Sequence, residues 1–116
     1  MDASEPDKLL ILWTSSDREV ALNMLTMYAQ NSIKNGWWEQ VSLILWGPSQ
    51  RLFIGDAEVR SKVEELQKMG IRVMACVACA NKYGLTEALR SAGVEVFGMG
   101  TVLTDWLKSG SRTITL

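Results

Sequence analysis

The chain has 116 residues, of which 47% are hydrophobic, which suits one domain (1–116) and leaves no room for two of ordinary size. Its 12 basic and 13 acidic residues are scattered along the sequence, so charge argues against nucleic acid or an anionic membrane as a partner. The sequence contains no histidine, which excludes Ser-His and Cys-His catalysis and removes the commonest metal ligand.

The N-terminal residues 1–7 are polar and partly acidic, and we expect them to form a loose extension. The apolar run that follows, from Lys8 to Trp13, has the length of a strand and is too short for a signal peptide or a membrane span. The sequence therefore predicts a cytoplasmic protein, and in that reducing compartment its two cysteines are expected to remain thiols.

The first predicted elements are a buried strand and a long helix. The continuous apolar run Lys8–Trp13 is typical of a strand buried on both faces in a parallel sheet. Residues 16–19 (Ser-Asp-Arg-Glu) have the form of a capping box, which predicts a helix that runs to about Lys34. No charged residue occurs from position 20 to 33. Either this helix has a wide apolar face with a polar strip, or its outer side packs against another subunit, which is the explanation we favour.

The second strand is predicted at Val41–Trp46 and is broken by Gly47-Pro48. Residues 49–55 suit either a short helix or a loop folded over the sheet. Asp56 is expected to cap an ordinary amphipathic helix with a charged outer side. The ion pairs expected on that side join Glu58 to Lys62 and Glu64 to Lys68.

The second half of the chain continues to alternate strands with helices, which predicts an α/β fold whose parallel sheet is covered on both faces through right-handed crossovers. The elements expected there are a strand at Ile71–Ala75, a helix at 77–83 closed by Gly84, a helix at Thr86–Gly93, a strand at Val94–Phe97, a helix capped by Thr101, and a strand at Arg112–Leu116. The residues of the last helix expected to face the core are Val102, Leu103, Trp106 and Leu107.

Chemistry is expected beyond the carboxyl ends of the strands, because ligands of open parallel sheets bind where the strand-to-helix loops gather. Cys76 and Cys79 are both placed there, at Cys-x-x-C spacing directly after the third strand. The neighbouring loops supply the candidate substrate-binding residues Trp13, Thr14, Ser15, Trp46, Gly47, Gly98 and Met99. The two tryptophans end neighbouring strands, where they could wall an apolar pocket or simply cover the core.

If a helix begins at Val77, Cys76 is its N-cap and Cys79 lies in its first turn, near the positive end of the helix dipole. That field favours the thiolate, which is the nucleophilic form of cysteine. Two alternatives are a pair of small core residues and a thioredoxin-like dithiol. No Trp or Pro flanks the pair, which argues against the dithiol. Without a second cysteine pair or a phosphate-binding glycine motif, no metal and no cofactor is predicted.

The segment from Gly70 to Leu85 resembles the cysteine region of the DsrE/DsrF-like family, which includes TusD-like sulfur-relay proteins. The shared pattern is a glycine, an apolar strand, a cysteine, a short helix with alanines, polar or basic residues, and a glycine before an aliphatic residue. Cys76 matches the family's sulfur-carrying cysteine, whereas Cys79 falls where small residues such as alanine are common.

This resemblance implies a three-layer α/β/α domain around a five-stranded parallel sheet, assembled into trimers or hexamers. It also implies a sulfur carrier or sulfurtransferase in which Cys76 accepts sulfane sulfur as a persulfide from a donor protein and passes it to an acceptor thiol. The spacing of the two cysteines, and not the resemblance, adds the hypothesis that Cys79 resolves that persulfide as a disulfide. The alternative function is a non-catalytic assembly or small-ligand-binding protein with structural cysteines.

Overall fold

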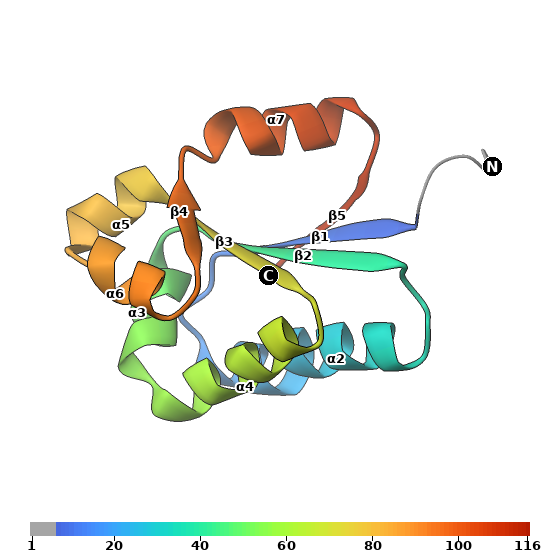
Figure 1. Ribbon diagram of the computed structural model, residues 1–116, viewed down its shortest axis with the longest axis horizontal. Coiled ribbons are helices and arrows are strands. Elements are labelled where there is room, and N and C mark those ends of the chain that lie inside the picture. Colours follow the sequence, from blue (N-terminus) through green and yellow to red (C-terminus); the bar gives the residue numbers. More distant parts are fainter. Residues whose placement is uncertain (1–6) are drawn as a thin grey trace.

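A five-stranded parallel sheet forms the centre of the structure, with strand order β4-β3-β2-β1-β5 (Figure 1). The computed structural model describes residues 7–116, so the expected loose extension lies almost entirely outside the described residues. Every predicted strand boundary is correct to within one residue, and the predicted α/β fold is confirmed. The strands are β1 (Lys8–Trp13), β2 (Gln40–Leu45), β3 (Arg72–Cys76), β4 (Glu95–Phe97) and β5 (Arg112–Thr115).

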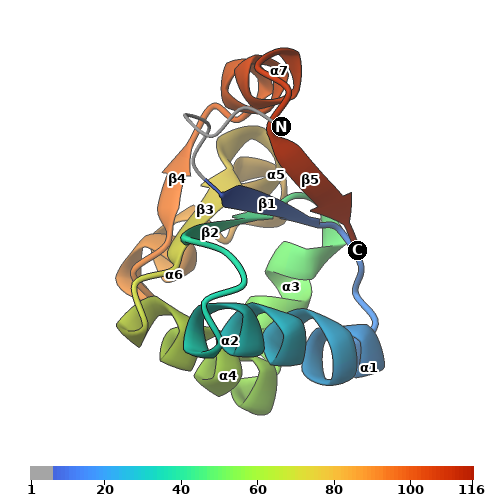
Figure 2. The same ribbon diagram turned by 90° about the vertical axis from the view of Figure 1, so that its right-hand side faces the viewer.

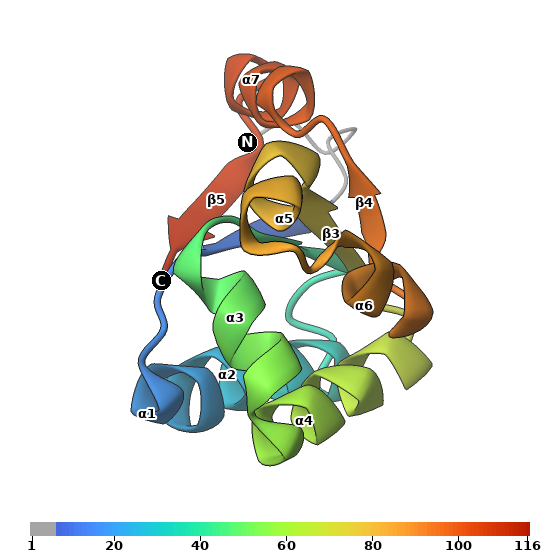
Figure 3. The same cartoon turned by 90° about the vertical axis from the view of Figure 1, so that its left-hand side faces the viewer.

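Helices cover both faces of the sheet, but unequally. Figure 2 shows one face covered by the first helix and α4, and the opposite face covered by α7, with α5 on the same side. Figure 3 looks onto the carboxyl-terminal edge of the sheet, where α3, α5 and α6 lie. The helical segments are α1 (Arg18–Val20), η1 (Ala21–Leu25), α2 (Thr26–Lys34), α3 (Pro48–Gly55), α4 (Ala57–Lys68), α5 (Val77–Tyr83), α6 (Thr86–Ser91) and α7 (Gly100–Lys108).

Alternate side chains of each strand enter two separate cores, because successive residues of a strand point to opposite faces of the sheet. The larger core lies between the sheet and the first helix and α4, and it contains Leu9, Ile11 and Leu43. The smaller core lies under α7 and consists of the buried residues Leu10, Ile44, Met74, Cys76 and Met99. Cys76 is therefore on the α7 side of the sheet.

The first helix ends at Lys34 as predicted, but its cap and its middle differ from the prediction. Asp17, not Ser16, is the N-cap, and its Oδ1 accepts the backbone N–H groups of Glu19 (2.8 Å) and Val20 (3.4 Å). The segment η1 is a five-residue π-helix. Thr26, the residue that follows it, donates from Oγ1 to the carbonyl of Ala21 at 2.9 Å. Ser16 and Asp17 are both of residue types that cap helices, and Asp17 is the one that occupies the N-cap position.

The alternative left open for residues 49–55 is resolved as helix α3, which starts at Pro48. Asp56 caps α4 as predicted, and the Val59 N–H together with the guanidinium of Arg18 holds the pKa of this carboxyl below its ordinary value. The predicted ion pairs on the outer side of α4 are absent from the ion pairs of residues 7–116. Glu58 instead pairs with Arg18 of α1, and Lys62 pairs with Glu65 at 3.7 Å.

Helix α7 begins at Gly100 with Met99 as its N-cap, so the prediction that Thr101 caps it is wrong. Leu107 was expected to face the core but is 54% exposed, because one helix lying on a sheet buries only a narrow stripe. Among the described residues, every helix is too short or too polar to cross a membrane. The core-facing stripe of α7 is Val102, Leu103 and Trp106.

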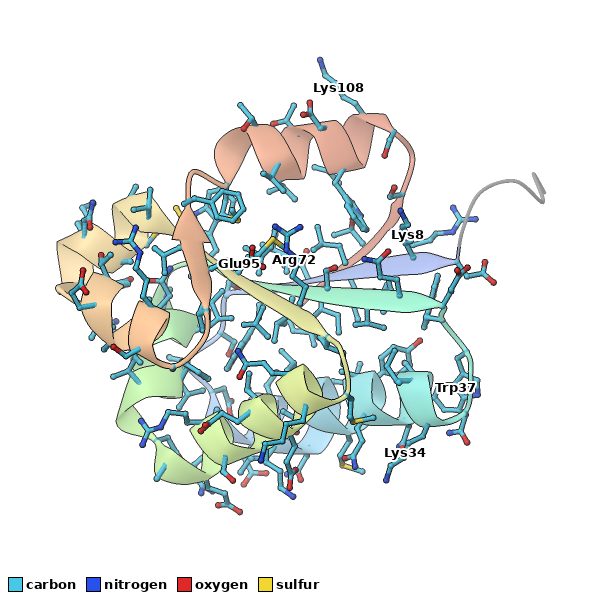
Figure 4. All side chains as sticks on the ribbon, in the orientation of Figure 1. Lys8, Lys34, Trp37, Arg72, Glu95 and Lys108 are labelled. Carbon is cyan, nitrogen blue, oxygen red and sulfur yellow. The ribbon has the colours of Figure 1, made fainter. Side chains whose placement is uncertain are left out.

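Arg72 and Glu95 are the first residues of β3 and β4, whereas Cys76 ends β3. Their ion pair joins the short outermost strand β4 to β3. The Arg72 guanidinium bonds both carboxylate oxygens, at 2.6 and 3.0 Å (Figure 4). The pair lowers the pKa of Glu95 and raises that of Arg72. Both side chains are half exposed, so the pair sets the position of β4 more than it adds stability.

Candidate functional site

Cys76 lies where the sequence predicts it, at the junction of a strand and a helix. It is the last residue of β3 and the N-cap of α5, and it is 6% exposed. Its neighbours in the smaller core are apolar side chains, among them Met74 and Met99. The Cys76 side chain forms no capping hydrogen bond with α5. Apolar groups therefore enclose the thiol, and the thiol does not cap the helix.

Cys79 is the third residue of α5 and is half buried, and its side chain packs against the smaller core that contains Cys76. In a capping box, the side chains at the N-cap and at the third helical position each reach the other residue's backbone N–H, so these two residues are neighbours across the first turn. Here two sulfur atoms occupy these positions. Both cysteines are free thiols.

The surroundings of Cys79 favour its neutral form. Burial raises the pKa of the Cys79 thiol, and so do its hydrogen bond with the Cys76 side chain and the charge that Cys76 carries when ionised. The backbone N–H of Gly47 and the charge of Lys82 act in the opposite direction, but they are the weaker influences. At neutral pH Cys79 is therefore held as a thiol beside Cys76.

Gly47 brings the turn after β2 into the site. Its backbone has φ 80° and ψ −134°, a conformation that only glycine adopts without strain. From this turn, the Gly47 N–H acts on the Cys79 thiol and lowers its pKa. The candidate Gly47 thus contributes a backbone donor.

The first turn of α3 fastens the carboxyl ends of three neighbouring strands, through two buried side chains that sequence reasoning missed. Gln50 Nε2 donates to the carbonyls of Leu45 and Cys76, both at 3.1 Å. Ser49 Oγ donates to the Trp13 carbonyl at 2.6 Å. We call Ser49 and Gln50 the strand-end clamp. The sequence signal that could have identified them is a pair of polar residues directly after Gly47-Pro48, in the loop that follows the second predicted strand.

The other predicted site residues divide into two groups. Trp46 packs against the smaller core and Met99 belongs to it, so both lie on the same side of the sheet as the cysteines. Gly98 is the exposed residue before Met99. Thr14 and Ser15 instead bind backbone, since both N–H groups donate to the Leu116 carbonyl, at 2.7 and 3.2 Å.

Of the two alternatives left open for the tryptophans, Trp13 follows the second, since it covers the core and shares no pocket with Trp46. Trp13 is fully buried in the larger core. It pairs with Leu45 in the sheet, and Trp46 comes one residue later. Because side chains alternate along a strand, the two indoles point to opposite faces.

A shallow hollow in the surface lies away from the cysteines, between α3, α4 and α6, with a volume of about 400 Å³. Its lining contains none of the candidate residues. The residues that line it are Ile54, Arg60, Glu64, Ala88, Ser91 and Ala92.

Comparison with solved structures finds the same fold over nearly the whole chain. BT1422, a conserved protein of unknown function from Bacteroides thetaiotaomicron, is 38% identical with a TM-score of 0.93, and the match covers 95% of each chain. The YchN protein of E. coli is 18% identical with a TM-score of 0.72, covering 95% of this chain and 99% of its own. MTH1491, a protein of unknown function from Methanobacterium thermoautotrophicum, is 19% identical with a TM-score of 0.67, covering 94% and 98%.

No curated protein is significantly similar to the chain. The model of the DsrE/DsrF-like family, however, matches residues 7–116, which include both cysteines and all five strands. The resemblance seen around Cys76 thus extends over the whole described structure. The chain belongs to the DsrE/DsrF-like family.

Proposed function

We propose that the chain is a sulfur carrier, which accepts sulfane sulfur on Cys76 as a persulfide and passes it to an acceptor thiol. The observation that carries this proposal is the position of Cys76, at the end of β3 and the start of α5, in a chain that matches a family associated with sulfur relay. Its working environment is a reducing cytoplasm, and its partners are a sulfur donor and a sulfur acceptor protein.

The chemistry is a transfer of one sulfur atom between thiols. The Cys76 thiolate attacks the outer sulfur of a donor persulfide R–S–SH, the S–S bond of the donor breaks, and the donor leaves as a thiol. The apolar side chains around Cys76, including Met74 and Met99, suit a soft, polarisable sulfur atom. They also exclude water from the bound persulfide.

A second candidate function is a non-catalytic assembly or ligand-binding protein with structural cysteines. The observation in its favour is the burial of Cys76, which is 6% exposed, since free cysteine is among the most buried residue types. It predicts that neither cysteine accepts sulfur while the protein is folded.

Sulfur loading of single-cysteine variants distinguishes the two functions. After a short exposure to glutathione persulfide at neutral pH, the Cys79→Ser variant should gain the mass of one sulfur atom on the peptide containing Cys76. The Cys76→Ser variant should gain none in the same time, because burial, the largest cause of the raised pKa of Cys79, still favours the neutral form of this remaining thiol. Mass spectrometry of intact protein and of peptides gives the result. Equal labelling of both variants, or labelling of neither, would contradict the assignment of Cys76.

We also propose that the chain associates with copies of itself through the outer side of the first helix. Met24 and Met27 are 41% and 52% exposed there, on a stretch without charged residues from position 20 to 33. Light scattering at micromolar concentration should give the mass of a trimer or a hexamer, and Met27→Lys should lower it. Ser61→Lys, which adds the same charge at an exposed position of α4, outside the first helix, provides a comparison. A monomeric wild-type protein would rule out this interface.

A further inference from the structure

We propose that Cys79 discharges the persulfide carried by Cys76, forming a disulfide between the two cysteines and releasing the outer sulfur as hydrogen sulfide. This inference rests on the proposed function, since it needs a persulfide on Cys76. It gives the second cysteine of the chain a reaction of its own, and it predicts a product, sulfide, that transfer to an acceptor thiol does not give.

Placement carries this inference. Cys76 is the N-cap of α5 and Cys79 is its third residue. Side chains at these two positions reach each other's backbone N–H in a capping box, so the two residues are neighbours across the first turn of the helix. The Cys79 side chain packs against the same apolar core that contains Cys76. The chain has two cysteines in all, so Cys79 is the one thiol that the fold itself holds at the Cys76 sulfur.

The difference in exposure between the two cysteines favours an internal reaction. Cys76 is 6% exposed, whereas Cys79 is half buried and reaches the surface. A thiol from solution must approach Cys76 through the apolar side chains of the smaller core, but Cys79 is already beside it. An internal thiol has an effective concentration far above that of any thiol in solution.

The step balances without a further reactant. The Cys79 thiolate attacks Sγ of Cys76, the bond between Sγ and the outer sulfur breaks, and the outer sulfur leaves with the electron pair of that bond. It takes up the persulfide proton and the proton lost by Cys79, and departs as hydrogen sulfide. The two cysteine sulfurs are oxidised to a disulfide, and the sulfane sulfur is reduced to sulfide.

Protonation of Cys79 sets the pace of this step. The groups that act on Cys79 are Cys76 at the start of α5, Lys82 at its end, and the backbone N–H of Gly47 before α3. Helix α7 faces the same core with the uncharged Val102, Leu103 and Trp106. Because the pKa of Cys79 is raised, its thiolate is scarce at neutral pH. Discharge is therefore slow at neutral pH, which leaves time for transfer to an acceptor.

The test follows the persulfide with time. Reduced wild-type protein and Cys79→Ser are loaded anaerobically with glutathione persulfide, freed of excess donor, and analysed by intact mass and by a sulfide assay. Wild type should convert its persulfide to a disulfide with one sulfide released for each disulfide. In Cys79→Ser the persulfide should last at least about a hundredfold longer.

A matched variant tests the geometry. The double variant Ala78→Cys, Cys79→Ser moves the second thiol by one residue to an exposed position of α5, which does not face the N-cap. Its persulfide should last as long as that of Cys79→Ser. Discharge as fast as in wild type would show that the facing positions are not required, and would overturn the inference.

The possible failures can be told apart. If Cys79→Ser takes up no sulfur, the proposed function itself is wrong. If both wild type and Cys79→Ser take up sulfur and retain it equally long, the carrier function stands and discharge by Cys79 is wrong. Disulfide that forms without an equal amount of sulfide would also overturn the discharge step.

Discussion

A Gln50→Leu variant is expected to lose about 3 kcal/mol of folding free energy, because the backbone carbonyls of Leu45 and Cys76 lose a buried donor. Gln50 is fully buried, and leucine has a similar volume, so little of the loss comes from a cavity. The Oε1 atom of Gln50 has no hydrogen-bond partner, and removing it returns a part of the loss. Denaturant unfolding monitored by tryptophan fluorescence measures the difference.

The same substitution elsewhere on the chain serves as the control. Gln67 Nε2 also donates to a backbone carbonyl, that of Gly93 at 3.2 Å, but near the surface, where water can replace it. Gln67→Leu should therefore change the free energy of unfolding by less than about 1 kcal/mol. If both variants lose the same free energy of unfolding, the hydrogen bonds of Gln50 in the strand-end clamp stabilise the fold no more than a hydrogen bond near the surface does.

A Gly47→Ala variant is expected to lose about 2 kcal/mol, since any residue with a Cβ is strained at φ 80° and ψ −134°. No atom lies within 4 Å of the added methyl group, so the loss comes from the backbone. When the backbone relaxes, its N–H moves away from the Cys79 sulfur. Because that N–H lowers the pKa of Cys79, its loss raises the pKa further. Iodoacetamide labelling of Cys79 should then require a higher pH.

Gly55→Ala separates backbone strain from the addition of a methyl group. The added Cβ of Gly55 also meets no atom within 4 Å, but Gly55 has no positive φ and lies at the end of α3. This variant should be unchanged or gain up to about 1 kcal/mol, with the labelling of Cys79 unaltered. A Gly47→Ala protein as stable as Gly55→Ala would show that the turn tolerates a side chain.

The sheet was predictable from the sequence because its strands are short apolar runs that end at breakers. Lys8–Trp13 is the clearest case, since its predicted and observed ends are identical. Cys76 was predictable as a helix start for a related reason. Residues 77–83 have room for one short helix before Gly84, whose φ of 68° ends it. Local signals of this kind place elements to within a residue.

The composition of the site was less predictable, because it depends on contacts between distant segments. Gln50 bonds Cys76 across 26 residues, and nothing near either residue in the sequence signals that contact. The choice between the two alternatives for Trp13 was open for a different reason. Both indoles end strands, but the pairing of Trp13 with Leu45 places Trp46 one residue further along. A shift of one residue decides which core a strand side chain enters.

The strand-end clamp has a consequence for the kinetics of folding. Its bonds join residues that are 36 positions apart in one case and 26 in another, so they can form only after β1, β2 and β3 have come together. Contacts between distant parts of a chain form after the entropy of loop closure has been lost. Gln50→Leu should therefore accelerate unfolding and leave the refolding rate nearly unchanged. The edge that holds both cysteines would then be among the last parts of the molecule to become ordered.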